Sequence, residues 1–402
     1  MLKTLPIFLS SLTAAVLFVG CTSSSSSGGT DTTDTTLQGQ LVDSYIQDIN
    51  YSCADGSTGL TDINGTFSCD ELPVEFSLGG LRLGTLNTLT SDKQVFPQDL
   101  LGVARTDVNN TDVIAMARLL QSCDDDNNTA NGIQIRAQIR AAFADANTTF
   151  DGNELQTYAN DANITLIDED TAIEHLTQTT DFADAINALT KLPLNVKEAL
   201  LTPNNTLTQD VKNTISFMGN EERLAYDVYN KLYESFPTLT QFNKIATNSE
   251  YIHIQSVQLL AQKYITSSSE LTNLDANITN TINTPVDQMA AGVYDIVELQ
   301  NLYDALIDMG EDNQEAALKV GCMVEVTDID DLLRDIQTAQ DSNASDVVAV
   351  FEFLRDGSYK HYWSFDNALK GIGIADGCCD IGVINGIDYC HPEYPQVQHG
   401  KR

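Results

Sequence analysis

Metal-type side chains recur at helical spacing between residues 222 and 361, and no other feature of the sequence constrains the fold as strongly. Six of them stand in apolar, helix-like surroundings: Glu222, Glu250, His253, Glu325, Asp328 and His361. An α-helix turns about 100° per residue, so Glu250 and His253, three positions apart, point the same way from one helix. The same spacing relates Glu325 to Asp328. The chain is therefore expected to bring oxygen and imidazole donors together between packed helices.

The segments around these residues have the apolar periodicity of amphipathic helices. Four long helices are predicted, at residues 215–233, 240–264, 316–338 and 347–369. The stretch 267–312, between the second and the third, carries a shorter helix at 299–309. In ferritin-like bundles one long connection of this kind reverses the direction of the chain. We therefore expect a multidomain, mainly α protein with a ferritin-like four-helix bundle and a crossover connection.

Two alternatives remain open for individual residues of the pattern. A buried carboxylate beside an imidazole needs a compensating partner, which is either a cation or a direct Glu–His hydrogen bond. Taken alone, the pair Glu250 and His253 favours the hydrogen bond. Spacing alone also admits Glu221, which aligns with the apolar residues of its helix, in place of Glu222. Glu222 is preferred because Glu-x-x-Ala-x-x-x-Tyr, which starts there, resembles the first ligand helix of rubrerythrins.

Five sequence blocks resemble a known ferritin-like family. In chain order they are MGNEERLAYDVYNKLY, IATNSEYIHIQSV, ELQNLYDAL, ALKVGCMVEVTDIDDL and LRDGSYKHYWSF. Together they span about residues 213–369 and are similar to the family catalogued as domain of unknown function 2202. This resemblance implies a four-helix bundle with a metal site, and it implies little about a reaction.

Carried over position by position, the resemblance implies that the six residues named above are metal ligands. The chain departs from the ferritin and rubrerythrin pattern at one point, because Ser358 stands where their fourth helix has the Glu of Glu-x-x-His. Asp328 is expected to replace the missing carboxylate, and if it points outward we expect one ion or a less tightly bound pair. Four carboxylates and two imidazoles suit two Fe or Mn ions, and the ligands do not exclude zinc.

The first twenty residues have the form of an export signal. A mainly apolar run at 5–19 follows Lys3 and is too short to span a bilayer with normal margins. The run ends in FVGC, which resembles the lipobox of bacterial lipoproteins with Phe in place of the usual Leu. The resemblance implies that Cys21 becomes a lipid-anchored N-terminus in the cell envelope; ordinary cleavage or an uncleaved anchor is the alternative. Thr22, rather than Asp, indicates the outer membrane if the cell has one.

Five further segments are predicted after the signal. Residues 21–37 form a polar flexible tether. Residues 38–105 are predicted to form strands, with an Asn64-Gly65 hairpin turn. Two blocks of this segment, GQLVDSYIQDINYSC and GLTDINGTFSC, resemble the small β-sandwich modules of bacterial surface lipoproteins. Those modules look like the regulatory domains of carboxypeptidases. A helical connecting segment is expected at 106–212, the bundle at 213–370, and a Cys-containing extension at 371–402. His175, in the connecting segment, is interpreted as an ordinary surface or packing residue.

Seven cysteines remain besides Cys21, so at least one lacks a partner within the chain. Export to an oxidising compartment permits disulfides. Proximity predicts two bridges: Cys53 with Cys69, and Cys390 with Cys378 or Cys379. Cys322 lies in an apolar helix and is predicted to be a buried thiol. The alternative at the C-terminus is a zinc knuckle that uses Cys378, Cys379, Cys390 and His391.

Charge narrows the choice of partners. The 57 acidic and 21 basic residues give a formal net charge of −36, which makes nucleic acid and anionic membrane surfaces poor partners and cations good ones. The Asp/Asn run at 124–128 has the oxygen donors for Ca²⁺, although a solvated loop is the favoured interpretation.

Three functions are considered: a redox-active metalloprotein that acts on oxygen or peroxide, a non-catalytic metal-binding or storage lipoprotein, and a surface interaction scaffold. The sequence does not name a protein partner.

Overall fold

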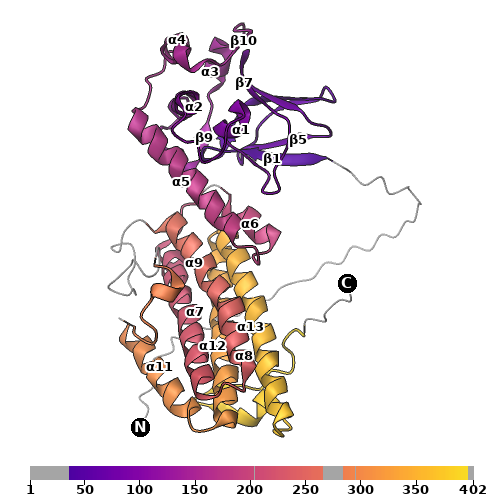
Figure 1. The fold of residues 1–402 in the computed structure, drawn as a ribbon, viewed down its shortest axis with the longest axis vertical. Helices are drawn as coiled ribbons and strands as arrows, with labels where there is room; N and C mark the ends of the chain where they lie inside the picture. The colour runs from indigo at the N-terminus through magenta and orange to yellow at the C-terminus, as the bar shows by residue number, and fades with distance from the viewer. Residues whose placement is uncertain (1–35, 203, 266–283, 295, 397–402) are drawn as a thin grey trace, which may run out of the picture. The chain divides into compact units, whose positions relative to one another are not determined.

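The computed structural model describes residues 36–202, 204–265, 284–294 and 296–396, shown as a ribbon in Figure 1. The predicted signal, Cys21 and most of the tether lie outside the described residues, as does the first part of the predicted crossover. Strands dominate the N-terminal part of the described chain and helices the C-terminal part. Among the described residues, no helix combines the length and the apolar character that a bilayer crossing requires.

Two sheets make up most of the strand-rich region. The first has the order β5-β1-β8, from Thr66–Cys69, Leu37–Leu41 and Gln94–Val95. The second has the order β10-β7-β6-β3-β4, from Thr148–Thr149, Leu81–Leu86, Val74–Leu78, Asn50–Cys53 and Thr58–Leu60. Alternate side chains of β6 are buried, as expected when one face of a sheet covers a core. Phe76 of β6 packs edge-on against Phe67 of β5, with ring centroids 5.0 Å apart, so the two sheets share one core.

The predicted hairpin at Asn64-Gly65 is wrong, although the turn itself forms. Gly65 has φ 67°, in the left-handed region that glycine adopts at little cost. However, β4 pairs with β3, whereas β5 pairs with β1 in the other sheet. The carboxylate of Asp62 explains the divergence, because it accepts the backbone N–H groups of Asn64 and Thr66 at 2.8 Å. That side chain satisfies a donor that a hairpin would use in its ladder.

The connecting segment is mostly helical, as predicted, but it also returns strands to the sheets. Its helices and those just before it are α1 Pro97–Leu101, α2 Thr111–Ser122, α3 Ala137–Ala142, α4 Leu155–Ala162, α5 Glu169–Ala188 and α6 Leu194–Leu200. β10 extends the second sheet along β7, and β9 Ile133–Gln134 pairs with β2 Ile46–Gln47. These two-residue strands are too short to give a periodic signal.

The helical bundle is built from helices at nearly the predicted positions, with the second predicted helix divided into α8 Thr240–Ile245 and α9 Tyr251–Tyr264. The others are α7 Gln209–Ser235, α12 Gln314–Asp341 and α13 Ser345–Gly371, with α11 Val297–Gly310 in the connection. Figure 1 shows α7, α12 and α13 side by side, and α12 packs against both of the others. Tyr229, Phe242 and Phe365 fill the interior, with ring centroids 5.1–5.7 Å apart. This is the ferritin-like bundle that the element order predicted.

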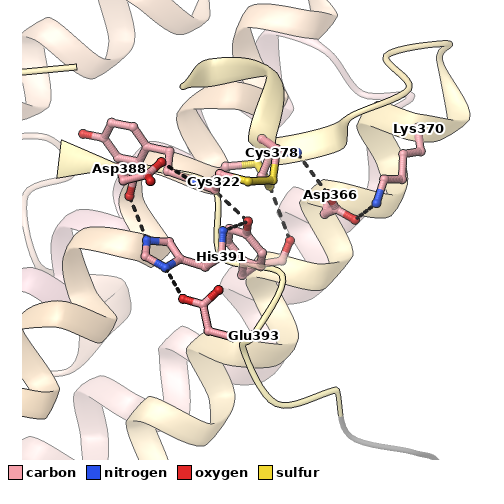
Figure 2. Close-up of a disulfide and its surroundings, with 11 residues drawn as sticks. Cys322, Asp366, Lys370, Cys378, Asp388, His391 and Glu393 are labelled. Carbon is pink, nitrogen blue, oxygen red and sulfur yellow. Dashed lines mark hydrogen bonds and ion pairs between the residues drawn. A yellow bond between two sulfur atoms is a disulfide. The ribbon is translucent and has the colours of Figure 1, made fainter. Parts of the chain in front are cut away.

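Three disulfides cross-link the described chain. Cys53 is joined to Cys69, and Cys390 is joined to Cys379, one of the two partners left open by the sequence. Cys322 is not a free thiol, so that prediction is wrong: it is bonded to Cys378 at a sequence separation of 56 (Figure 2). The zinc knuckle is excluded because all three of its cysteines are in disulfides. Cys123 is a buried free thiol.

The C-terminal extension folds back on the bundle, and this explains the Cys322 bridge. Asp366 of α13 accepts the backbone N–H of Cys378 at 3.0 Å and pairs with Lys370 at 2.7 Å (Figure 2). Beyond the short turns, β11 Val383–Ile384 and β12 Ile387–Asp388 form a two-stranded ladder. The Tyr362 hydroxyl then donates to the Tyr389 carbonyl at 3.2 Å. These contacts bring distant cysteines together, which sequence proximity does not indicate.

Candidate metal centre

All six predicted ligands are buried inside the bundle. Their exposed fractions are 1–2% for Glu222, Glu250, His253 and Glu325, 6% for His361 and 8% for Asp328. Four helices and one π-helical turn supply them. Glu222 lies on α7, Glu250 ends the turn before α9, and His253 lies on α9. Glu325 and Asp328 lie on α12, and His361 lies on α13. A buried charged group is costly unless a partner of opposite charge is present. The arrangement of these side chains therefore needs an explanation.

Five of the six residues form two donor groups that share one carboxylate. The first group is Glu222, Glu250 and His253, and the second is Glu250, Glu325 and His361, each with its ligand atoms within 4.8 Å of one another. Glu250 belongs to both because its two oxygens diverge. Its Oε2 lies 3.0 Å from Nδ1 of His253, and its Oε1 lies 2.9 Å from Nδ1 of His361.

Each imidazole also faces a second carboxylate from another helix. Nδ1 of His253 lies 3.0 Å from Glu222 Oε2, and Nδ1 of His361 lies 3.4 Å from Glu325 Oε2. The two imidazole centroids are 5.7 Å apart. The result is a near-symmetric pair of half-sites, each with one imidazole, one carboxylate of its own and one oxygen of Glu250.

A π-helical turn at Ala246–Glu250 divides the helix that the sequence predicted as continuous over 240–264. Such a turn inserts an extra residue and rotates the helix after it relative to the helix before it. Glu250 ends the turn, and His253 lies in the first turn of α9. The rotation lets both side chains face inward while Phe242, before the turn, stays in the apolar core. A search for regular 3.6-residue periodicity does not detect a turn of this kind.

Asp328 lies beside the two donor groups without belonging to either. Its Oδ2 accepts a 2.6 Å hydrogen bond from the hydroxyl of Ser358, the residue at the position of the absent glutamate. Burial raises the pKa of Asp328 to about 8, and the charge of Glu325 adds to the shift. Asp328 thus points inward, as expected, but it contacts the serine rather than an imidazole.

The neighbouring Glu221 takes a different direction from Glu222. Burial, followed by the charges of Asp331 and Asp328, raises the pKa of Glu221 well above its ordinary value. It joins neither donor group, whereas Glu222 contacts His253 directly. The structure therefore places Glu222, the preferred alternative, among the clustered donors.

Three supporting contacts were not predicted from the sequence. Tyr229 donates a short hydrogen bond from its hydroxyl to Glu325 Oε1. Ser249 Oγ lies 3.3 Å from Nε2 of His253. At Gly357 of α13, a Cβ atom would lie 2.5 Å from Cε1 of His253, so only glycine leaves room for that ring. A glycine in the middle of a helical pattern was the available signal, since such residues often mark a close approach.

The buried carboxylates and imidazoles of the two donor groups strongly shift one another's pKa values. Burial lowers the pKa of His361, but the carboxylates of Glu250 and Glu325 outweigh that effect and raise the pKa to about 10. In the same way, Glu222 and Glu250 raise the pKa of His253 well above its ordinary value. Burial acts to raise the pKa of Glu250, yet the two imidazoles lower it. Without a metal, the raised pKa values favour the protonated form of both imidazoles, which is the counter-ion of the carboxylates.

The donor set fits a divalent transition metal. Carboxylate oxygens with imidazole nitrogens suit Fe, Mn and Zn. Within the part of the chain that the structure describes, the buried atoms Glu222 Oε1 and Asp328 Oδ1 have no hydrogen-bond partner. Unpaired buried acceptors of this kind cost free energy, and an ion between the carboxylates would relieve that cost. The residues present thus match what the bundle family implies.

Metal uptake should release protons, because a protonated imidazole has no free lone pair on Nδ1 with which to bind a metal ion. The raised pKa values of His253 and His361 give the sign: affinity increases as pH rises from about 6 to about 8, since fewer protons then compete with the metal. We expect at least about one proton released per ion at neutral pH. Calorimetric titration with Mn²⁺ in two buffers of different ionisation enthalpy measures this number. Identical heats in both buffers would contradict the expectation.

The acidic run at Asp124, Asp125 and Asp126 forms a third group with metal-ligand spacing. Its carboxylates already have donors: Asp124 accepts the backbone N–H groups of Asn128 and Gln134 at 2.8 and 3.0 Å. Asp126 accepts the Asn131 side chain at 3.0 Å, and both Asp125 and Asp126 are exposed. These contacts are those of an ordinary hydrogen-bonded loop.

Fold and site together define a class of protein: a ferritin-like helical bundle whose interior holds groups of carboxylates and histidines that could bind a metal ion. Residues 211–378 match the family described as "Uncharacterized protein domain (DUF2202)". The chain is similar to "Uncharacterized protein MJ0754" of Methanocaldococcus jannaschii, with 31% identity over 171 residues, which is 42% of this chain and 81% of the relative. The chain belongs to the DUF2202 family.

A solved structure is also similar. The crystal structure of hypothetical protein MJ0754 from Methanococcus jannaschii is 29% identical in sequence and has a TM-score of 0.36. The match covers 42% of this chain and 86% of that chain.

Proposed function

We propose that the bundle holds two Fe or Mn ions and that the protein reacts with oxygen or peroxide in the cell envelope. The shared carboxylate of Glu250 is the observation that supports two ions best. Each of its oxygens faces one imidazole, and each imidazole faces one further carboxylate. A single Glu–His hydrogen bond, the simpler alternative, does not account for a second histidine on the other side of the same carboxylate.

Each ligand residue can be assigned to one or both of the proposed ions. Glu222 and His253 would hold one ion, Glu325 and His361 the other, and Glu250 both. When bound, the ions would supply electrons to the oxidant. The Tyr229 hydroxyl fixes the orientation of Glu325, and Phe353 packs edge-on against His253 with ring centroids 5.3 Å apart. Such apolar walls limit the access of water and keep the ligands in place.

A second candidate is metal binding or storage without turnover, and one observation favours it. Ser358 replaces a carboxylate that ferritins and rubrerythrins have, and Asp328 bonds to that serine instead of an imidazole. A site with one carboxylate fewer next to the ions would hold them less tightly. An interaction scaffold without metal is the third candidate. This function does not explain why carboxylates and imidazoles are buried together in the bundle.

We further propose that the chain is a lipoprotein anchored through Cys21, with the bundle outside the cytoplasm. The FVGC sequence and the short apolar run before it support this, and so do the three disulfides, which form in oxidising compartments. The anchor would keep the bundle close to a membrane, with outer-membrane sorting suggested by Thr22.

One experiment separates the candidates. The full chain, purified in detergent and loaded with Fe²⁺ or Mn²⁺, is analysed for bound metal and then exposed to oxygen or hydrogen peroxide. About two ions per chain and stoichiometric consumption of the oxidant are expected for the redox function. Bound metal without consumption would leave only the storage function, and a chain that binds no metal would leave only the scaffold.

A further inference from the structure

A second set of reactive side chains lies in the strand-rich region, away from the carboxylates of the bundle. Asp43 and Ser44 form the turn that follows β1, and His175 comes from α5. Nδ1 of His175 lies 3.0 Å from Asp43 Oδ1, and Nε2 of the same ring lies 3.1 Å from Ser44 Oγ. One imidazole therefore connects a carboxylate to a hydroxyl through its two nitrogens.

The surroundings hold this arrangement in one state. Asp43 is fully buried, and its other oxygen accepts a 2.9 Å hydrogen bond from the Gln121 side chain. The carboxylate accepts from Nδ1–H, so in the neutral imidazole the lone pair is on Nε2, the nitrogen that faces the serine hydroxyl. Burial lowers the pKa of His175, but Asp43 and the carbonyl of Thr129 raise it above its ordinary value. A raised pKa strengthens the imidazole as a base.

The backbone of Ser44 is strained. Its φ of 47° lies in the left-handed region, which costs free energy for any residue with a Cβ atom. A glycine would occupy this position without strain, yet the chain has serine. Strain that persists at a reactive side chain is a common property of functional sites.

Ser44 and His175 both line a cavity of about 680 Å³. Tyr45 and Phe182 provide apolar walls, and Gln94 and Thr179 provide polar ones. Asp181 is the only carboxylate among the residues that line it, and Lys263, which also lines it, is already paired with Asp346 at 2.6 Å. The charged groups of the lining therefore favour neither an anion nor a cation strongly. The volume and lining fit a small neutral ester with an apolar acyl group.

We propose that Ser44, His175 and Asp43 form a hydrolytic site for neutral carboxylic esters. Ser44 Oγ would attack the acyl carbon while His175 Nε2 takes the hydroxyl proton, and the imidazolium would then protonate the departing alcohol. Water, deprotonated by the same nitrogen, would attack the acyl-serine, return its proton to Ser44 and release the acid. Asp43 keeps the imidazole in the required tautomer throughout.

A fluorescent fluorophosphonate and p-nitrophenyl acetate test the site on the full chain in detergent, with EDTA present so that the metal centre takes no part. We expect the probe to label Ser44, located by peptide mass, and the ester to be hydrolysed. Ser44→Gly should abolish labelling and reduce hydrolysis by about 100-fold or more, as should His175→Ala. Ser44→Gly also relieves the strained φ, so its melting temperature should not fall.

Ser52→Ala, which removes an exposed hydroxyl of β3, is the matched control and should keep both signals. Labelling at another residue, no labelling at all, or hydrolysis by Ser44→Gly at the rate of the unmodified chain would overturn the proposal and leave a purely structural hydrogen-bond network. None of these results depends on whether the bundle binds metal.

Discussion

Replacement of Glu250 by alanine is expected to abolish binding of both metal ions, whereas replacement of Glu222 should abolish binding of one. Glu250 contributes an oxygen to each half-site, while Glu222 contributes to one. Elemental analysis after loading with Fe²⁺ or Mn²⁺ should give about two ions for the unmodified chain, about one for Glu222→Ala, and none above background for Glu250→Ala. The difference between the two variants is the specific signature of a shared ligand.

Glu234→Ala is the matched control, since it removes an exposed carboxylate from the same helix as Glu222. It should keep about two ions, which shows that a lower net negative charge alone does not prevent loading. Circular dichroism melting of each variant verifies that the bundle is folded. Equal loss of metal in Glu222→Ala and Glu250→Ala would argue for a single ion held by all the ligands together.

Gly357→Ala is expected to weaken metal binding without any change in a ligand. The new Cβ atom would lie 2.5 Å from Cε1 and 2.6 Å from Nε2 of His253, closer than nonbonded carbon atoms approach. The ring cannot move aside freely, because its Nδ1 is held between Glu222 and Glu250. We expect a loss of about 1–3 kcal/mol in the free energy of unfolding from overpacking, and a decrease in metal affinity of about tenfold or more from the displaced ring.

The same helix provides the control for this prediction. Gly371 ends α13, and a Cβ atom there would meet nothing within 4 Å. Gly371→Ala should leave metal affinity unchanged and the free energy of unfolding within about 1 kcal/mol of the original value. Chemical unfolding of the metal-free chains and competitive metal titration measure the two quantities. If Gly357→Ala binds metal as Gly371→Ala does, His253 is not confined as the structure indicates.

The sequence predicted the bundle well because its evidence is local. Apolar periodicity defines α12 and α13 to within three residues at each end, whereas α7 begins six residues before its predicted start. The i, i+3 spacing alone indicates that Glu250 and His253 share a face. The same reasoning failed at Cys322. A cysteine in an apolar helix looks the same in sequence whether it is a thiol or half of a bridge. Only the return of the extension, held by Asp366 and the Tyr362 hydroxyl, decides between them.

The finer geometry of the site depends on contacts that no spacing rule contains. The partner of Asp328 was expected to be a metal ion in place of the missing glutamate, yet its nearest donor is the serine that replaced that glutamate. The position of Glu250 between the two imidazoles also depends on the π-helical turn that it ends, which regular helical periodicity does not predict. His175 was interpreted as an ordinary packing residue, because nothing in its own segment indicates that a turn more than a hundred residues earlier places Asp43 and Ser44 at its two nitrogens.

The bridge between Cys322 and Cys378 has a practical consequence for anyone who makes this protein. Cys322 lies one turn before Glu325 on α12, so the disulfide links the C-terminal extension covalently to the helix that carries Glu325 and Asp328. A host that synthesises the chain in its reducing cytosol would leave Cys322 and Cys378 as free thiols. Two laboratories with the same gene and different expression compartments would then be studying covalently different molecules.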